Sequence, residues 1–157
     1  MKPNIGIKPE DLAEVAKCMS SLLADEFVLY TKTRNAHWNI EGPDFHTMHL
    51  FFESQYTDLA EIIDGVAERI RSLGHYAPAT LGSFLELTHL TEKLSHSNTG
   101  SGFLAELLED HESIIILLRG YITLFEQKFH DLGTSDYVTG LMETHEKLAW
   151  MLRAHLK

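Results

Sequence analysis

The sequence has one cysteine, no long apolar run and few basic residues. Cys18 is the only cysteine among the 157 residues. A single cysteine excludes an internal disulfide and is typical of a protein in a reducing compartment. The longest apolar run, 114–118, is far shorter than the roughly 18 residues of a membrane helix. The first thirty residues also lack the apolar segment of a secretory signal. We therefore expect a cytoplasmic protein with no membrane partner.

Positive charge is scarce as well. Thirteen lysines and arginines face 23 aspartates and glutamates, so the formal net charge is −10. This balance argues against a freely exposed nucleic-acid surface and fits a protein that attracts cations. Residues 1–8 form a short tail whose basic side chains are Lys2 and Lys8, too few for us to expect strong DNA binding.

Several catalytic signatures are missing. The sequence contains no GxSxG nucleophile elbow, no P-loop, no GxGxxG turn and no HExxH zinc motif. The remaining candidates for chemistry are histidines and carboxylates. Asp110, His111 and Glu112 are consecutive, and adjacent residues of a helix point in different directions, so a site shared by these three is not expected.

Four long segments repeat apolar residues at steps of three and four, which predicts amphipathic helices packed in a bundle. The first runs from Pro9 to Ala36 or His37, the second from Phe45 to Leu73, the third from about Gly102 to His130, and the last to about His155, with Thr134 or Ser135 as its N-cap. The stripe of the second helix comprises Phe45, Met48, Phe52, Tyr56, Leu59, Ile63, Val66, Ile70 and Leu73.

Residues 74–101 form a long connection between the second and third helices. The segment 83–90 predicts one short helix inside it, and a linker composition follows. A crossover of this length allows the second and third helices to run parallel, as in ferritin-like bundles. We expect loop or surface roles for its histidines, His75, His89 and His96.

The second helix has a polar face beside its apolar stripe. That face carries imidazole and carboxylate groups: His49, Glu53, Asp64 and Glu68. With His49 at 0° and about 100° per residue, the carboxylates fall between about +40° and +100°, and the stripe centres near about −60°. His37 lies just before the turn that opens the helix. Imidazole and carboxylate are the ligand types that suit iron, manganese or zinc.

Distance decides how these groups can form a site. His49 and Asp64 are separated by roughly 22 Å along the axis at about 1.5 Å per residue, whereas metal–ligand bonds are about 2 Å long. Two antiparallel copies, paired near Thr57, bring His49 of one chain to Asp64 of the other and create two equivalent sites. The small residues Ala60 and Ala67 favour close approach. The alternative is a solvated face whose charges make only salt bridges.

The stretch HWNIEGPDFHTMHLFFE, followed by DLAEIIDGVAERIRSLG, resembles the Dps family (DNA-binding protein from starved cells, the mini-ferritins). The matching motif positions are His37, Trp38, Asn39, Gly42, Phe45, His49, Glu53, Asp64, Glu68 and Arg69. The similarity extends from NIGI near the start to the KLAWMLRAHL ending. Glu53 stands where the family commonly has Asp.

The resemblance implies an all-α, ferritin-like four-helix bundle in a single domain, 1–157, that assembles into a hollow homo-dodecamer. It implies a di-iron ferroxidase site at the dimer interface, with His37, His49, Glu53, Asp64 and Glu68 as ligands. Trp38 corresponds to a tryptophan suggested as an electron donor; a buried aromatic at a helix end is the alternative. The implied reaction oxidises Fe(II), preferably with hydrogen peroxide and more slowly with dioxygen, and stores ferric mineral, protecting against oxidative stress.

Two further features follow from the same resemblance. Asp131, Asp136 and Glu143 correspond to a segment that borders acidic pores, with plain surface roles as the alternative. Arg69 and Arg71 are interpreted as salt-bridge partners. Two rival functions remain open: a shell that mainly compacts DNA, and an ordinary oligomeric bundle with no metal chemistry.

Overall fold

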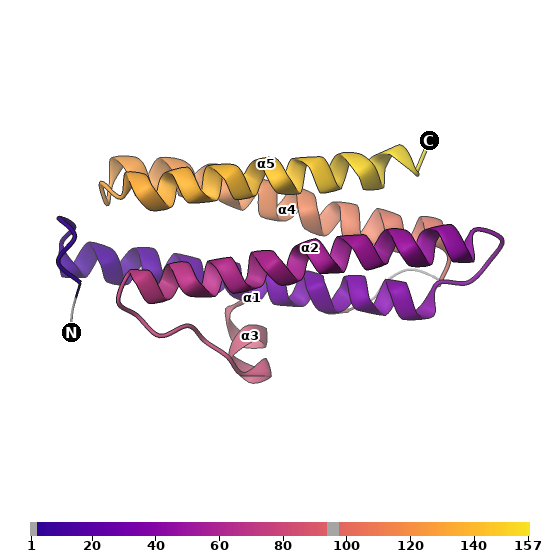
Figure 1. Cartoon of the computed structure of the whole chain (residues 1–157), viewed down its shortest axis with the longest axis horizontal. Helices are drawn as coiled ribbons and strands as arrows, with labels where there is room; N and C mark the ends of the chain where they lie inside the picture. The colour runs from indigo at the N-terminus through magenta and orange to yellow at the C-terminus, as the bar shows by residue number, and fades with distance from the viewer. Residues whose placement is uncertain (1–2, 94–97) are drawn as a thin grey trace.

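The computed structural model describes residues 3–93 and 98–157, which form four long helices and one short helix. The elements are α1 (Pro9–Asn39), α2 (Phe45–Ser72), α3 (Leu81–Leu87), α4 (Gly100–Gln127) and α5 (Leu132–Ala154). Helices α1 and α2 lie side by side, α4 and α5 form a second pair against them, and α3 lies beside α1 (Figure 1). Helices α2 and α4 run in the same direction. The predicted bundle with a long crossover is confirmed.

Most predicted helix bounds hold to within three residues, and the ends are set by capping groups. Helix α1 continues past His37 to Asn39. The short helix begins at Leu81, two residues before the predicted start, because the Thr80 hydroxyl accepts a hydrogen bond from the Ser83 amide. Helix α4 likewise begins at Gly100 rather than Gly102, after Thr99 as N-cap.

The predicted N-cap of the last helix was wrong. Asp131 occupies that position, and its carboxylate accepts a hydrogen bond of 2.9 Å from the Thr134 amide. Thr134 and Ser135 lie inside the first turns of α5 and are buried. An aspartate is a strong N-cap acceptor, so the helix starts at the earlier acidic residue in spite of Gly133 in its first turn.

The apolar stripes of the long helices meet in one core, as predicted. Phe52, Leu59 and Leu118 are among its fully buried side chains. Phe45 was wrongly assigned to the core, because it is the first residue of α2 and its ring is exposed, tilted against His49. Cys18 packs against the core and is half-buried, and burial raises the pKa of its thiol. No helix in the described ranges has the length and apolarity to cross a bilayer.

Buried polar side chains of α1 hold the crossover in place. Both oxygens of the buried Asp25 carboxylate are used: the Thr88 hydroxyl (2.7 Å) and the His89 amide (2.6 Å) bond to one, and His89 Nδ1 lies 2.9 Å from the other. His89 is therefore a loop residue, as predicted, with an anchoring contact. His75 also lies in the crossover, and His96 lies outside the described residues.

A buried lysine extends this anchoring to α4. Lys32 Nζ lies 3.1 Å from a Glu106 oxygen and 2.5 Å from an Asp110 oxygen, and it donates to the Thr91 carbonyl at 3.2 Å. Burial raises the pKa of Asp110, while Lys32 opposes that rise. Glu112, next to Asp110 and His111 in the sequence, is exposed and pairs with Arg153 at 2.6 Å. The three consecutive side chains thus contact three different partners: Lys32, His145 and Arg153.

A chain of three polar side chains crosses the core between α1, α4 and α5. His145 Nε2 lies 2.9 Å from a Glu26 oxygen, and His145 Nδ1 lies 2.9 Å from His111 Nδ1. Burial lowers the pKa of His111 well below its usual value, and His145 lowers it further. With His111 neutral, one Nδ1 of the pair donates to the other, and His145 Nε2–H donates to Glu26. Burial and then Glu26 raise the pKa of the nearby Tyr137 to about 12.

The lowered pKa of His111 predicts a loss of stability in acid. The unfolded chain takes up this proton near the ordinary histidine value of about 6.5, before the folded chain does, so the free energy of unfolding should fall below about pH 6.5. The slope should be at most about 1.4 kcal/mol per pH unit for one proton. Thermal unfolding between pH 5 and pH 8, at fixed protein concentration, measures it. His111→Gln should flatten this dependence; an unchanged slope would contradict the assignment.

Candidate metal site

His37 and His49 lie against each other at the junction of α1 and α2. Their rings stack with centroids 3.7 Å apart. His37 Nδ1 lies 2.8 Å from the His49 carbonyl oxygen, and His49 Nδ1 lies 2.8 Å from the His37 carbonyl oxygen. The His37 carbonyl belongs to the last turn of α1, where carbonyls have no partner within the helix. The exchange of bonds therefore closes the end of α1 onto the start of α2.

These two hydrogen bonds also fix the tautomers of both rings. A carbonyl oxygen only accepts, so each Nδ1 carries the proton and donates it. In the neutral rings each Nε2 then keeps its lone pair, which is the form that binds a metal ion. Backbone carbonyls that hold the second nitrogen are a common way of orienting metal-binding histidines. The two residues are 12 positions apart in the sequence, and the geometry of their rings is compatible with metal binding through Nε2.

Aromatic and charged groups surround the histidine pair. The Tyr56 ring meets His37 edge-on at 5.2 Å, and its hydroxyl lies 3.5 Å from a Glu53 oxygen. Arg34 places its guanidinium 4.4 Å from the Tyr56 ring centroid and 4.9 Å from that of Trp38. Trp38 is 63% exposed, so its alternative reading as a buried aromatic is wrong for the single chain.

The predicted carboxylates at the far end of α2 remain uncovered. Asp64 and Glu68 are exposed, and among the described residues neither enters an ion pair. Arg69 turns instead to Asp131, 3.4 Å away, and to the Thr134 hydroxyl. The two acidic residues are four positions apart, so they face the same way. Whether this exposed face is a solvated surface or part of a metal site is a question that the single chain leaves to experiment.

The two halves of the predicted site do not meet within one chain. His49 and Asp64 are fifteen positions apart on α2, roughly 22 Å of helix. In the described residues, no three histidine, cysteine or acidic side chains are gathered closely enough to hold a metal ion. Between the halves, Thr57 and Ala60 are exposed, while Ala67 packs against the core. One chain therefore presents two separate groups of candidate ligands.

The predicted pore residues divide into two groups. Asp131 is 2% exposed and caps α5 while pairing with Arg69, so its assignment to a pore was wrong. Its sequence position before a helix explains the burial, because an N-cap carboxylate turns back toward the amides of its own helix. Asp136 and Glu143 are exposed on α5, and their pore role stays a prediction. Arg71 donates to the His75 carbonyl at 2.8 Å rather than to an acidic side chain.

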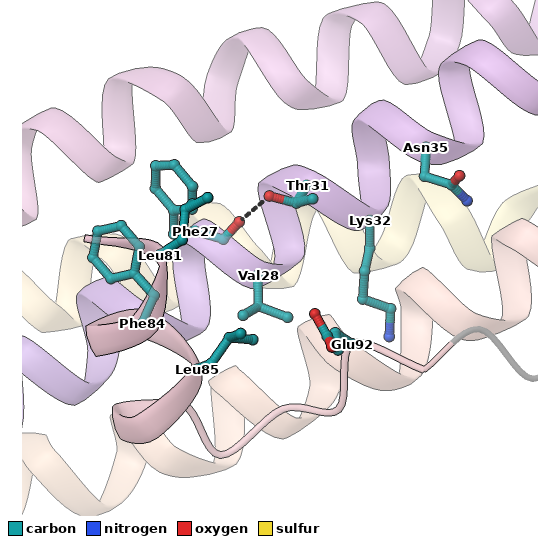
Figure 2. Close-up of a pocket in the computed structure, with 9 residues that line it drawn as sticks. All are labelled: Phe27, Val28, Thr31, Lys32, Asn35, Leu81, Phe84, Leu85 and Glu92. Carbon is teal, nitrogen blue, oxygen red and sulfur yellow. Dashed lines mark hydrogen bonds between the residues drawn. The ribbon is translucent and has the colours of Figure 1, made fainter. Parts of the chain in front are cut away.

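An apolar hollow of about 350 Å³ lies elsewhere, between α1, α3 and the crossover (Figure 2). Phe27, Phe84 and Leu85 line it, with Lys32 and Glu92 toward one end. None of the five predicted ligands contributes to this hollow. Its lining offers no set of ligands comparable to the histidine pair.

Comparisons with known proteins agree with this architecture. The model of the ferritin-like domain family matches residues 17–157. DNA protection during starvation protein 2 of Bacillus anthracis is 36% identical over 143 residues, which cover 91% of this chain and 97% of that protein. An uncharacterized low temperature-induced protein of Nostoc is 40% identical to this chain over 154 residues, which cover 98% of this chain and 86% of that protein.

The crystal structure of a Dps protein from Vibrio cholerae superposes with a TM-score of 0.92 at 32% identity, covering 99% of this chain and 97% of that one. That protein is described as a member of a broad superfamily of ferritin-like diiron-carboxylate proteins. This chain belongs to the Dps family. It is a mini-ferritin by fold, and the family that the sequence motif predicted is confirmed.

Some residues of this Dps protein that matter to the site escaped prediction. Tyr56 was assigned to the apolar stripe, although its hydroxyl reaches Glu53. Arg34 was not singled out, and its position on α1, three and four residues from His37 and Trp38, was the available signal, since residues at this spacing share a helix face. Glu26 and Lys32 were missed because a charged residue inside an apolar stripe looks like a surface residue until its partner is known.

The fixed tautomers predict that His49 binds divalent metal directly. His49→Ala in the assembled protein should weaken Co(II) binding at least about tenfold, because even the loss of a group that only orients a ligand costs that much. Titration calorimetry measures the affinity. His46→Ala is the matched control, since His46 is exposed in the first turn of the same helix. Equal affinities in the wild type and the His49 variant would remove His49 from the site.

Proposed function

We propose that this protein is a ferroxidase mini-ferritin, which oxidises Fe(II) at sites shared by two subunits and stores the ferric product inside a hollow homo-dodecamer. The observation that carries the proposal is the histidine pair, whose Nδ1 atoms both donate to carbonyls, so that the lone pair of each neutral ring lies on Nε2. Iron is a substrate here, and neutral imidazole with carboxylates suits it. A cytoplasmic location belongs to the same proposal.

The dimer follows from where the groups lie on α2. An antiparallel two-fold pairing near Thr57 sets His37, His49 and Glu53 of one subunit against Asp64 and Glu68 of the other. The operation is symmetric, so it builds two equivalent sites per dimer. Glu53, Thr57, Asp64 and Glu68 are exposed in the single chain and His49 is half-buried, so this face of α2 is open to a partner.

The ligand types assign the roles in oxidation. His37 and His49 bind as neutral donors. Asp64 and Glu68 neutralise the charge that grows when Fe(II) becomes Fe(III), and the longer Glu68 can bridge two ions. Glu53 serves the second ion. We propose hydrogen peroxide as the preferred oxidant and dioxygen as a slower one: two Fe(II) ions supply the two electrons that reduce one peroxide to water, so no hydroxyl radical is released and the cell is protected from oxidative stress.

A mixing experiment tests whether the site is shared. His49→Ala and Asp64→Ala should each abolish rapid Fe(II) oxidation by peroxide while the shell still assembles. In shells that contain both variants, each mixed dimer holds one site with neither substitution. With random mixing, about a quarter of the wild-type sites should return. Differently tagged subunits, co-expressed and purified through both tags, provide the mixed shells, and stopped-flow absorbance follows the oxidation.

The control for this experiment pairs His49→Ala with His37→Ala. Both residues belong to the same half-site, so every site in a mixed dimer loses one histidine and no activity should return. Recovery in the control, or none in the test pair, would show that the halves are not contributed by different subunits. A variant that fails to assemble is recognised beforehand by size-exclusion chromatography.

DNA protection is the second candidate, because relatives from Bacillus anthracis and Helicobacter pylori carry that function in their names. The charge of −10 opposes direct binding to a polyanion. Lys8 is the one basic residue in the described part of the tail. We therefore propose that protection comes from removing iron and peroxide.

This proposal predicts no mobility shift of linear DNA by the assembled protein at physiological salt. A basic Dps protein known to compact DNA serves as the positive control in the same gel. A complete shift at protein concentrations near those of the control would favour the DNA-compacting function instead. A shift confined to low salt would be non-specific electrostatic attachment and would leave the proposal standing.

A further inference from the structure

Tyr56 lies at the centre of the contacts around the histidine pair. Its ring edge meets the His37 ring, with centroids 5.2 Å apart. Its face carries the Arg34 guanidinium at 4.4 Å. Its hydroxyl lies 3.5 Å from a carboxylate oxygen of Glu53. Tyr56 therefore touches two of the five proposed iron ligands from within the same subunit.

These contacts determine how the tyrosine can lose an electron. The guanidinium is a permanent positive charge on the ring face, so a positively charged ring is disfavoured there. Oxidation must then release the phenolic proton together with the electron. The Glu53 carboxylate beside the hydroxyl is an acceptor for that proton, and the His37 contact brings the ring next to an iron ligand.

Trp38 is less well placed for the same task. The ring contact that the structure gives it is with Arg34, at 4.9 Å, and its side chain is 63% exposed. Arg34 contacts the rings of both Trp38 and Tyr56, and a cation opposes the movement of positive charge between them. Tyr56 is half-buried, which shields an oxidised ring from solvent.

We propose that Tyr56 is a redox-active residue that supplies the second electron when peroxide meets a site holding a single Fe(II). The inference rests on the proposed ferroxidase function and deepens it. A lone Fe(II) gives peroxide one electron and would release a hydroxyl radical. A tyrosine at the site completes the two-electron reduction before that radical escapes.

The step balances with the reactants of the proposed function. The peroxide O–O bond breaks as Fe(II) gives one electron and Tyr56 gives the other. The phenolic proton leaves through Glu53 to a product oxygen. The products are Fe(III), one water, one hydroxide and a neutral Tyr56 radical. The next Fe(II) to arrive reduces the radical, and the phenol takes back one proton, so the cycle consumes two Fe(II) per peroxide.

Rapid-freeze electron paramagnetic resonance tests the inference on the assembled, full-length protein. One Fe(II) per site is loaded without oxygen and mixed with hydrogen peroxide. A tyrosyl radical signal is expected in the wild type and should be lost in Tyr56→Phe, which keeps the ring between Arg34 and His37. A spin trap for hydroxyl radical should report more escaped radical in this variant.

Tyr76→Phe is the matched control. Tyr76 also lies under a guanidinium, with Arg71 4.4 Å from its ring centroid, but it is 88% exposed in the crossover, away from the histidine pair. The radical signal and the spin-trap yield should be those of the wild type. Retention of the signal in the control and its loss in Tyr56→Phe together support the inference.

The remaining outcomes overturn it in different ways. If the wild type oxidises Fe(II) but forms no protein radical, or if the radical survives in Tyr56→Phe or has a tryptophan spectrum, Tyr56 is not the donor and the ferroxidase function stands. If the wild type does not oxidise Fe(II) with peroxide at all, the proposed function and the inference fall together.

Discussion

The reach of helix α2 is the constraint on which the organisation of this protein depends. The helix carries its histidine and its paired carboxylates on one face, but roughly 22 Å apart, and a metal ion needs ligands within about 2 Å. No rotamer change closes that gap. The chain therefore holds two half-sites, and a symmetric partner is the simplest way to complete both. The exposure of Glu53, Thr57, Asp64 and Glu68 in the single chain agrees with this.

The polar groups inside the bundle serve a different purpose. Asp25 and Lys32 of α1 hold the crossover and α4, and Glu26, His145 and His111 bond to one another across the core. Burial of a charged or polar group is costly unless it finds such partners. Because the crossover is held along α1, α4 can start at the far end of the bundle and run parallel to α2. The buried network thus supports the topology, while the candidate metal chemistry lies on the surface.

The sequence predicted most of the fold, because periodicity reports which face of each helix is buried. It failed where a single contact decides. Asp131 precedes a helix and looked like a surface acid, yet one hydrogen bond to the Thr134 amide turns it inward. Phe45 continues the apolar stripe of α2 but lies at its first turn, beyond the core. Periodicity describes the middle of a helix well and its ends poorly, since the ends depend on capping groups.

For the candidate site, the sequence showed the ligand types and their separation along the helix. It did not show how the histidine rings are oriented. The residue spacing cannot show that His37 and His49 exchange Nδ1 bonds with each other's carbonyls, because those bonds depend on the turn between two helices. The role of Tyr56 was missed for the same reason. Tyr56 follows Phe52 by four residues, which predicts a core position, and only the packing of α1 against α2 brings Arg34 over its ring.

The division between the two half-sites also separates their chemistry. The half with the histidine pair has its imidazoles oriented before any partner arrives, and it contains Tyr56, which contacts two of the predicted ligands. The half with Asp64 and Glu68 brings mainly negative charge on a solvated face. Under the proposed function, neither half alone neutralises the ferric ion and also fixes its geometry. Under that proposal, oxidation is tied to assembly, so that Fe(III) forms only where a shell is present to store it.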